Sequence, residues 1–318
     1  MQIPDSPESV EPPVTAEMAE PVEPPAATAS VKKSRKALVA IILLVVALVA
    51  ALGVLAFYLV QLSAANDRIA DQKQQIKEQK DLIDTKETFG AAMTGLLETA
   101  SEFDGVLMAS IVPFDDYEAI ATRAWQNRWT AEFVIEDTQT VQGYTDDLTA
   151  MLASAATEAG TNSTGTTYET VTDQLGRGFV SALIDDADSL CESDVLACVF
   201  SEDPYTVHFD AADAGAEYMN DWLKTGVAYH EFAHVLQMTN PEPTEIALEA
   251  FGGDDETMAD CFALTYLDGW TLDHRVWITS YSWWDVSIGY GYACDDAQRQ
   301  SIVDWYDALG YQTSPITQ

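Results

Sequence analysis

Basic residues are scarce in this sequence: its 318 residues include 15 Lys and Arg against 52 Asp and Glu, a formal net charge of -37. A protein that binds nucleic acid needs a positively charged face for the phosphates, so this class is excluded. From residue 87 onward, 41 acidic residues accompany six basic ones. We therefore expect a surface that repels anionic lipid and attracts cations or basic molecules.

Apolar periodicity is missing at the start of the chain. Residues 1–31 hold six acidic residues, no Lys or Arg, and seven of the twelve prolines. Such a segment cannot bury a core, so residues 1–36 are predicted to be a disordered tail that ends in a basic cluster at 32–36. The chain as a whole is 47% hydrophobic, which is enough for one sizeable domain or two small ones after the tail.

Charge is absent from the 24 residues between Ala37 and Val60. A helix of this length measures roughly 36 Å and can cross the hydrocarbon core of a bilayer. We predict a transmembrane helix at residues 37–61, with a cytoplasmic N-terminus and the remaining chain outside the cell, because basic residues precede the span. A cleavable signal sequence is the alternative, since the small residues Ser63-Ala64-Ala65 offer a cleavage site.

Half of a heptad pattern follows the span. Apolar residues recur at intervals of seven, at Leu62, Ile69, Ile76 and Ile83. The partner positions are mostly polar, with Ala65, Gln72, Gln79 and Lys86. Because a stable coiled coil needs apolar residues at both positions, residues 62–89 are expected to form a helical stalk that is either weakly dimeric or a solvated single-helix spacer.

Residues 90–318 are expected to form the extracytoplasmic domain, in an α+β, mainly helical fold. Apolar residues at helical spacing predict a helical N-terminal part at 90–156. The Thr, Ser and Gly content of Thr157–Thr170 predicts a surface loop, and residues 171–318 form the second part. In that part, Tyr205–Asp210 alternates apolar and polar residues as a half-buried strand does.

Only four cysteines occur in the chain, and all lie in the predicted outer domain: Cys191, Cys198, Cys261 and Cys294. Their spacing does not fit a zinc ribbon. In an oxidising compartment we expect two disulfides, and of the three possible pairings closure of the shortest loop favours Cys191 with Cys198 and Cys261 with Cys294.

Histidine is equally rare, yet two of the four stand in the motif His230-Glu231-Phe-Ala-His234. On a helix this spacing puts both imidazoles on one face, with Glu231 beside them to hold a water molecule. A second motif 22 residues later offers Glu256 as a third ligand and Asp260 as a partner for the far nitrogen of a ligand histidine. Two His and one Glu leave one zinc position open, so we predict one catalytic zinc ion per chain.

These two motifs resemble those of the gluzincin zinc peptidases, such as thermolysin, and more closely those of a bacterial family of neutral zinc metallopeptidases. The likeness covers about residues 200–310 and includes 256–263 and Gln298-Arg299. It implies that His230, His234 and Glu256 bind zinc and that Glu231 is the general base in the hydrolysis of a peptide or protein substrate. It also implies a zincin-like fold with an active-site helix beneath a small sheet.

One position departs from that family, whose members carry His-Gly shortly before the Gln-Arg pair where this chain has Ala293-Cys294. The sequence therefore does not decide which residue stabilises the oxyanion. His274, Tyr290 and Tyr292 are the nearby donors, and each could instead be a structural residue of this Trp- and Tyr-rich segment.

Two further expectations concern how the domain is used. If the strand at 205–210 lies at a sheet edge, it could hold an extended substrate by main-chain pairing. The rival to an enzyme is a membrane-tethered interaction domain in which zinc only stabilises the fold. A structural zinc site normally has four protein ligands, usually including Cys, and the cysteines here are not so spaced.

Overall fold

The computed structural model describes residues 35–162, 165–191, 195–291 and 294–310. The chain divides into two compact units, residues 1–74 and residues 75–318. Nearly all of the predicted tail, at residues 1–34, lies outside the described residues, and so does Tyr292.

Helix α1 runs without a break from Arg35 to Ser101, so the predicted transmembrane helix and stalk are parts of one helix. An 18-residue window within it has a mean hydropathy of 3.2, and none of that window is buried in a protein core. This part of α1 is long and apolar enough to cross a membrane. Ile69, Ile76 and Ile83 are also exposed in the single chain, and a stalk dimer stays a prediction.

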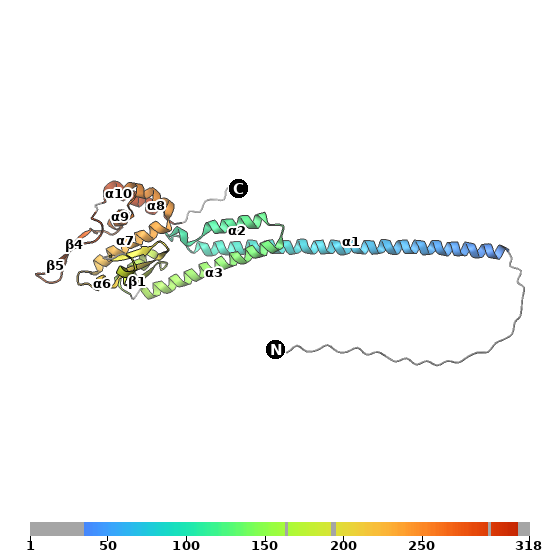
Figure 1. The fold of residues 1–318 in the computed structure, drawn as a ribbon, viewed down its shortest axis with the longest axis horizontal. Coiled ribbons are helices and arrows are strands. Elements are labelled where there is room, and N and C mark those ends of the chain that lie inside the picture. Colours follow the sequence, from blue (N-terminus) through green and yellow to red (C-terminus); the bar gives the residue numbers. More distant parts are fainter. Residues whose placement is uncertain (1–34, 163–164, 192–194, 292–293, 311–318) are drawn as a thin grey trace, which may run out of the picture. The chain divides into compact units, whose positions relative to one another are not determined.

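The second unit is an α+β fold with two small sheets, and helices make up most of it (Figure 1). After α1 the helices are η1 (Ala109–Ile111), α2 (Phe114–Gln126), α3 (Ala131–Asn162), α4 (Thr167–Gly176), α5 (Ala187–Leu190), α6 (Ala211–Ala214), α7 (Asp221–Thr239), α8 (Pro241–Leu248), η2 (Glu249–Phe251), α9 (Asp255–Tyr266) and α10 (Asp296–Asp307). The strands are β1 (Ser181–Asp185), β2 (Ala197–Phe200), β3 (Asp203–Asp210), β4 (Asp273–Trp277) and β5 (Trp283–Ser287).

The loop predicted at Thr157–Thr170 is wrong for most of its length, because α3 continues to Asn162 and α4 begins at Thr167. The threonines are accommodated by bonds to their own helix: the Thr157 hydroxyl donates to the Ala153 carbonyl at 2.9 Å. Thr166 and Glu169 form a capping box that starts α4. Threonine side chains can compete with the hydrogen bonds of a helix. Here they bond to the preceding turn or cap the helix start, so both helices are retained.

The strand predicted at 205–210 is present as β3, but it does not lie at an edge. The strand order is β1-β3-β2, with β1 parallel and β2 antiparallel to β3. Alternation along β3 shows that one face is buried, with Val207 and Phe209 in the core. Alternation does not show whether the backbone is paired on one side or both, which is why the edge position was not predictable. The antiparallel edge strand is β2.

One hydrophobic core joins the helical N-terminal part to the rest of the second unit. It includes Leu96 of α1 and Leu148 of α3 together with Phe209 of β3, Phe232 of α7 and Phe262 of α9. Helix α7 packs against α4, α9 and the strands β2 and β3. Residues 90–156 therefore support the helix that carries the two motif histidines.

Asn240 fixes the C-terminal end of α7 to this support. Its side-chain amide donates to the carbonyls of Leu236 and Leu107, at 2.9 and 2.8 Å. Its side-chain oxygen accepts from the backbone of Ala109 at 3.3 Å and of Gly310 at 3.1 Å. One buried side chain thus satisfies backbone groups from three separate segments.

Candidate metal centre

Helix α7 presents the first two candidate ligands from inside the core. Asn220 caps its N-terminus by accepting a hydrogen bond from the Leu223 amide at 3.1 Å. Residues 231–237 of this helix are all buried, because α7 is covered by neighbouring elements on several sides. The i, i+4 spacing then places His230 and His234 on the face toward α9, as the sequence predicts.

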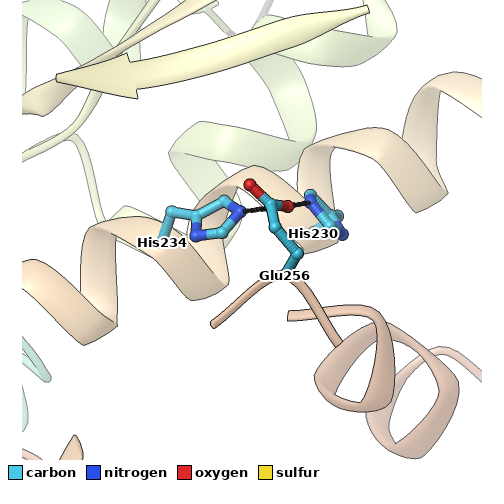
Figure 2. A group of neighbouring side chains, drawn as sticks. All are labelled: His230, His234 and Glu256. Carbon is cyan, nitrogen blue, oxygen red and sulfur yellow. Dashed lines mark hydrogen bonds and ion pairs between the residues drawn. The ribbon is translucent and has the colours of Figure 1, made fainter. Parts of the chain in front are cut away.

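Helix α9 brings the third candidate ligand to the same place. Asp254 caps it by accepting from the Thr257 amide at 3.0 Å, so Glu256 stands in the first turn. Figure 2 shows the Glu256 side chain reaching across to both histidines, which project from α7. Two helices that pack against each other therefore build the group, from ligands as far apart in the sequence as His234 and Glu256, which is 22 positions later.

The three ligand atoms form a nearly equilateral triangle. The two His Nε2 atoms lie 3.1 Å apart, and each lies 3.1 Å from the Oε2 atom of Glu256. Ligands of a tetrahedral zinc ion, with bonds of about 2.0 Å, lie roughly 3.3 Å from one another. His230, His234 and Glu256 thus form a group that could hold a metal ion, and their donor atoms suit zinc.

Asp260 and the loop after β5 orient the first histidine. The Nδ1–H of His230 donates to Asp260 Oδ1 at 2.9 Å, while the Tyr290 amide donates to Asp260 Oδ2 at 2.7 Å. Gly289 makes this approach possible, since its φ is +107° and a Cβ atom there would lie 2.6 Å from an Asp260 oxygen. Because Nδ1 bonds to this carboxylate, Nε2 is the ring nitrogen of His230 that is directed toward Glu256 and available to a metal ion.

Gln237 orients the second histidine. Its Oε1 accepts from the Nδ1–H of His234 at 2.8 Å, and its Nε2 donates to the Asp255 carbonyl at 2.9 Å. Gln237 is buried and joins α7 to the first turn of α9, next to Glu256. The sequence showed a glutamine three residues after His234, a spacing that allows contact on a helix, but no role was predicted for it.

Charges within the group influence one another. Burial alone would lower the pKa of His230, but hydrogen bonds to Asp260 and Glu256 and the charge of Glu231 together raise it to about 10. Burial opposes ionisation of Glu256, yet the two histidines outweigh it and hold its pKa below the usual range. Burial raises the pKa of Glu231. The site is therefore rich in negative charge, as a cation requires.

A cavity of about 290 Å³ opens beside His230 of this group. Its floor is formed by Val227, His230 and Glu231 of α7. One wall consists of residues 195–197, which lead into β2, and another consists of residues 287–290 at the end of β5 and in the loop after it. Glu231 thus faces the same space as a candidate ligand.

Both disulfides expected from loop closure are present, Cys191 with Cys198 and Cys261 with Cys294. Each encloses one wall of the cavity, because residues 195–197 lie inside the first loop and residues 287–290 inside the second. Cys261 directly follows Asp260, so the second disulfide fastens the Gly289 loop to the helix that orients His230.

The candidate oxyanion donors are placed differently. Tyr290 lines the cavity and lies over His230, with ring centroids 6.2 Å apart. Burial, with the charge of Glu256, raises the Tyr290 pKa to about 12, so its hydroxyl keeps its proton. His274 lies in β4, packs on the Trp270 ring, and is not among the described residues that line the cavity. Tyr292 lies outside the described residues, and the role of each as a donor stays a prediction.

Comparisons of the chain with models of protein families, with curated proteins and with solved structures find no match. The resemblance to zinc peptidases therefore depends on the two motifs alone. Function has to be argued from the geometry of the site.

Proposed function

We propose that this protein is a membrane-anchored, extracytoplasmic zinc peptidase that hydrolyses peptide bonds at the His230, His234 and Glu256 group. The observation that carries the proposal is the joint position of the metal group and Glu231. Three ligand atoms meet at mutual distances of 3.1 Å, and the carboxylate of the intervening residue faces the cavity beside them. A zincin-like active-site helix under a sheet is the corresponding assignment for α7.

The residues of this chain have distinct parts in that reaction. A bound zinc ion supplies a Lewis acid that polarises a carbonyl group and lowers the pKa of water toward about 7. Glu231 removes a proton from the attacking water at its carboxylate and returns it to the leaving amine nitrogen. Asp260 and Gln237 hold the two imidazoles in place. Tyr290, which lines the cavity, donates a hydrogen bond to the oxygen on which negative charge develops.

A purely structural zinc site in a non-catalytic domain is less well supported. A structural site normally surrounds its metal with four protein ligands, whereas the described residues supply a group of three. His230 of that group borders a cavity, through which a fourth partner could reach the metal from solvent. Both features favour chemistry over a purely structural ion.

An extended substrate fits the edge strand β2 rather than β3. Strand β2 pairs only with β3 among the described strands, and residues 195–197 at its start form a cavity wall. A peptide that added to this edge would lie beside the cavity that Glu231 lines. Main-chain hydrogen bonds would hold the peptide largely independently of its side chains.

The location follows from two features. The apolar part of α1 is preceded by basic residues at 32, 33, 35 and 36, which supports a cytoplasmic N-terminus. Disulfides persist in oxidising compartments, and both lie on the far side of the span in the sequence.

The proposal is tested by pairing loss of the base with retention of the metal. We expect Glu231→Gln to keep one zinc ion per chain while hydrolysis of casein falls by about a hundredfold or more, because the amide cannot accept the proton. Glu242→Gln, on the surface of α8, is the matched control. Chelator should abolish cleavage by the parent, and added zinc should restore it. Cleavage by Glu231→Gln at the parental rate would refute the assignment of the base.

A further inference from the structure

The hairpin of β4 and β5 exposes an unusual concentration of aromatic rings. Tyr281 at its tip is 91% exposed, and Trp277, Trp283 and Trp284 are 57%, 44% and 52% exposed. Residues 276–284 include no charged side chain. Figure 1 shows β4 and β5 at the periphery of the second unit, beyond α7 and α9.

Part of this cluster stabilises the hairpin itself. Trp277 and Trp283 face each other across the strands, with ring centroids 4.9 Å apart. Arg275 and Asp285 form the next cross-strand pair, with bonds of 2.7 and 3.0 Å. An isolated two-stranded hairpin needs such pairs. They do not account for Tyr281 or for the large exposed area of the tryptophans.

The hairpin continues directly into the candidate active site. Strand β5 ends at Ser287, and residues 287–290 form one wall of the cavity that contains His230 and Glu231. A chain segment held on the rings would therefore lie beside the reacting groups.

The neighbourhood of the hairpin is acidic. The Trp284 ring packs on Tyr218, with centroids 5.8 Å apart, and the Tyr218 hydroxyl donates to Asp213. The surrounding segment 210–221 carries four acidic residues and no Lys or Arg. A partner that contacts Trp284 meets this negative charge.

The basic residues from residue 87 onward already contact other groups of the same chain. From residue 87 onward there are six, and each contacts a group of its own chain: Arg123 with Asp137, Arg128 with Trp125, Arg177 with the Asp104 carbonyl, Lys224 with the Tyr168 ring, Arg275 with Asp285, and Arg299 with the Leu264 carbonyl. The surface can thus offer excess carboxylates to a cationic partner but has little to offer an anionic one.

We propose that the β4–β5 hairpin, residues 273–287, docks the substrate, and that the substrate segment is an extended polypeptide with Lys or Arg beside apolar residues. Aromatic rings bind such cations through their faces, and Arg275 already lies over the Trp283 ring at 4.9 Å. The inference rests on the proposed peptidase function and names its substrate class. Trp and Tyr also suit a lipid interface, but continuity with the cavity favours a polypeptide.

Binding is measured on the full chain with Glu231→Gln, so that the segment is held without being cleaved. The probes are labelled peptides of one length, one with Arg, Lys and Leu and its counterpart with Glu in place of each base. We expect the basic peptide to bind at least about tenfold more tightly than the acidic one. Tyr281→Ser and Trp277→Ser should each weaken it about threefold to tenfold, as loss of one ring does. Trp125→Ser, an exposed tryptophan on α2, is the control and should bind as the parent does.

The remaining outcomes distinguish failure of the docking proposal from failure of the proposed peptidase function. Equal binding of both peptides, or binding unaffected by the two hairpin variants, removes the hairpin as a docking surface. In reconstituted protein, quenching of tryptophan by brominated lipid that disappears in Trp277→Ser would assign the rings to the membrane instead. A basic peptide that binds through the hairpin but is never cleaved by the parent with zinc leaves docking in place and refutes peptidase activity.

Discussion

Gln237 illustrates how a single neutral side chain can set the geometry of a charged site. Its amide oxygen accepts from His234, and its amide nitrogen donates to the backbone carbonyl of Asp255. A carboxylate could replace only the first of these two bonds, and it would bring a negative charge against the carbonyl oxygen. Position 237 therefore requires an amide, whereas the equivalent position beside His230 holds the carboxylate of Asp260.

We expect Gln237→Glu and Gln237→Leu both to weaken zinc binding by about tenfold to a hundredfold, because partners of ligand histidines contribute that much. Competition with a chromophoric chelator measures the affinity directly. Gln300→Leu, an exposed position on α10, should leave it unchanged. Parental affinity in Gln237→Glu would mean that the bond to Asp255 contributes nothing to the site.

Gly289 and Gly291 form a natural pair of test and control. Both have positive φ angles, +107° and +72°, so alanine strains the backbone at either position. Only at Gly289 would the new Cβ also meet Asp260, while nothing lies within 4 Å at Gly291. We expect Gly291→Ala to lower the midpoint of thermal unfolding by about 2–4 °C and Gly289→Ala to lower it further and to weaken zinc binding. Equal effects of the two substitutions on zinc affinity would show that the Asp260 contact is unimportant.

At the scale of elements, a disulfide ties the edge strand β2 to the segment before it. The strand has four residues, and residues 195–197 at its start form a cavity wall inside the loop that Cys191 and Cys198 close. The metal ligands come from α7 and α9, which the core holds independently. Loss of the Cys191–Cys198 disulfide should therefore affect the cavity wall at 195–197 more than the metal group.

Replacing Cys191 and Cys198 together by Ser should leave the zinc content at one ion per chain and lower turnover by about tenfold or more, because the wall that positions the substrate is released. The free energy of unfolding should fall by about 2–3 kcal/mol for so short a loop. Zinc analysis, peptide hydrolysis and denaturant titration give the three values. Parental turnover in this variant would show that the wall is held without the bridge.

The elements that could be predicted from sequence are those with local signals. The spacing of His230, His234, Glu256 and Asp260 already states which side chains share a helical face, and both helices are present. The edge position of β2 and the cavity wall at 195–197 result from pairing between distant segments, which leaves no mark on either segment alone. The loop predicted at 157–170 failed because threonine composition suits a turn and also a helix in which each hydroxyl bonds to the preceding turn.

Across the whole molecule, the charged residues and the disulfides are arranged asymmetrically about the apolar part of α1. Basic residues precede the apolar part of α1, while the excess of acidic residues and both disulfides follow it. In a membrane protein, basic residues beside a span favour the cytoplasmic side, so the proposed topology leaves the cluster at 32–36 inside and the acidic domain outside. The oxidised cysteines and the sequence of charges therefore support one orientation.

That orientation can be tested with epitope tags at the two ends of the chain in intact cells. We expect an antibody to reach a C-terminal tag without permeabilisation and an N-terminal tag only after permeabilisation, because basic residues such as those at 32–36 favour the cytoplasmic side of a span. Replacing the four bases with Gln should reduce this asymmetry, while replacing Lys77 and Lys80, which lie 16 residues or more beyond the span, should have little effect. The same samples on a denaturing gel show whether both tags stay on one chain, as an uncleaved anchor requires. An N-terminal tag that is accessible on intact cells would reverse the topology, and separation of the two tags at the size expected for cleavage near Ala65 would replace the anchor with a signal sequence.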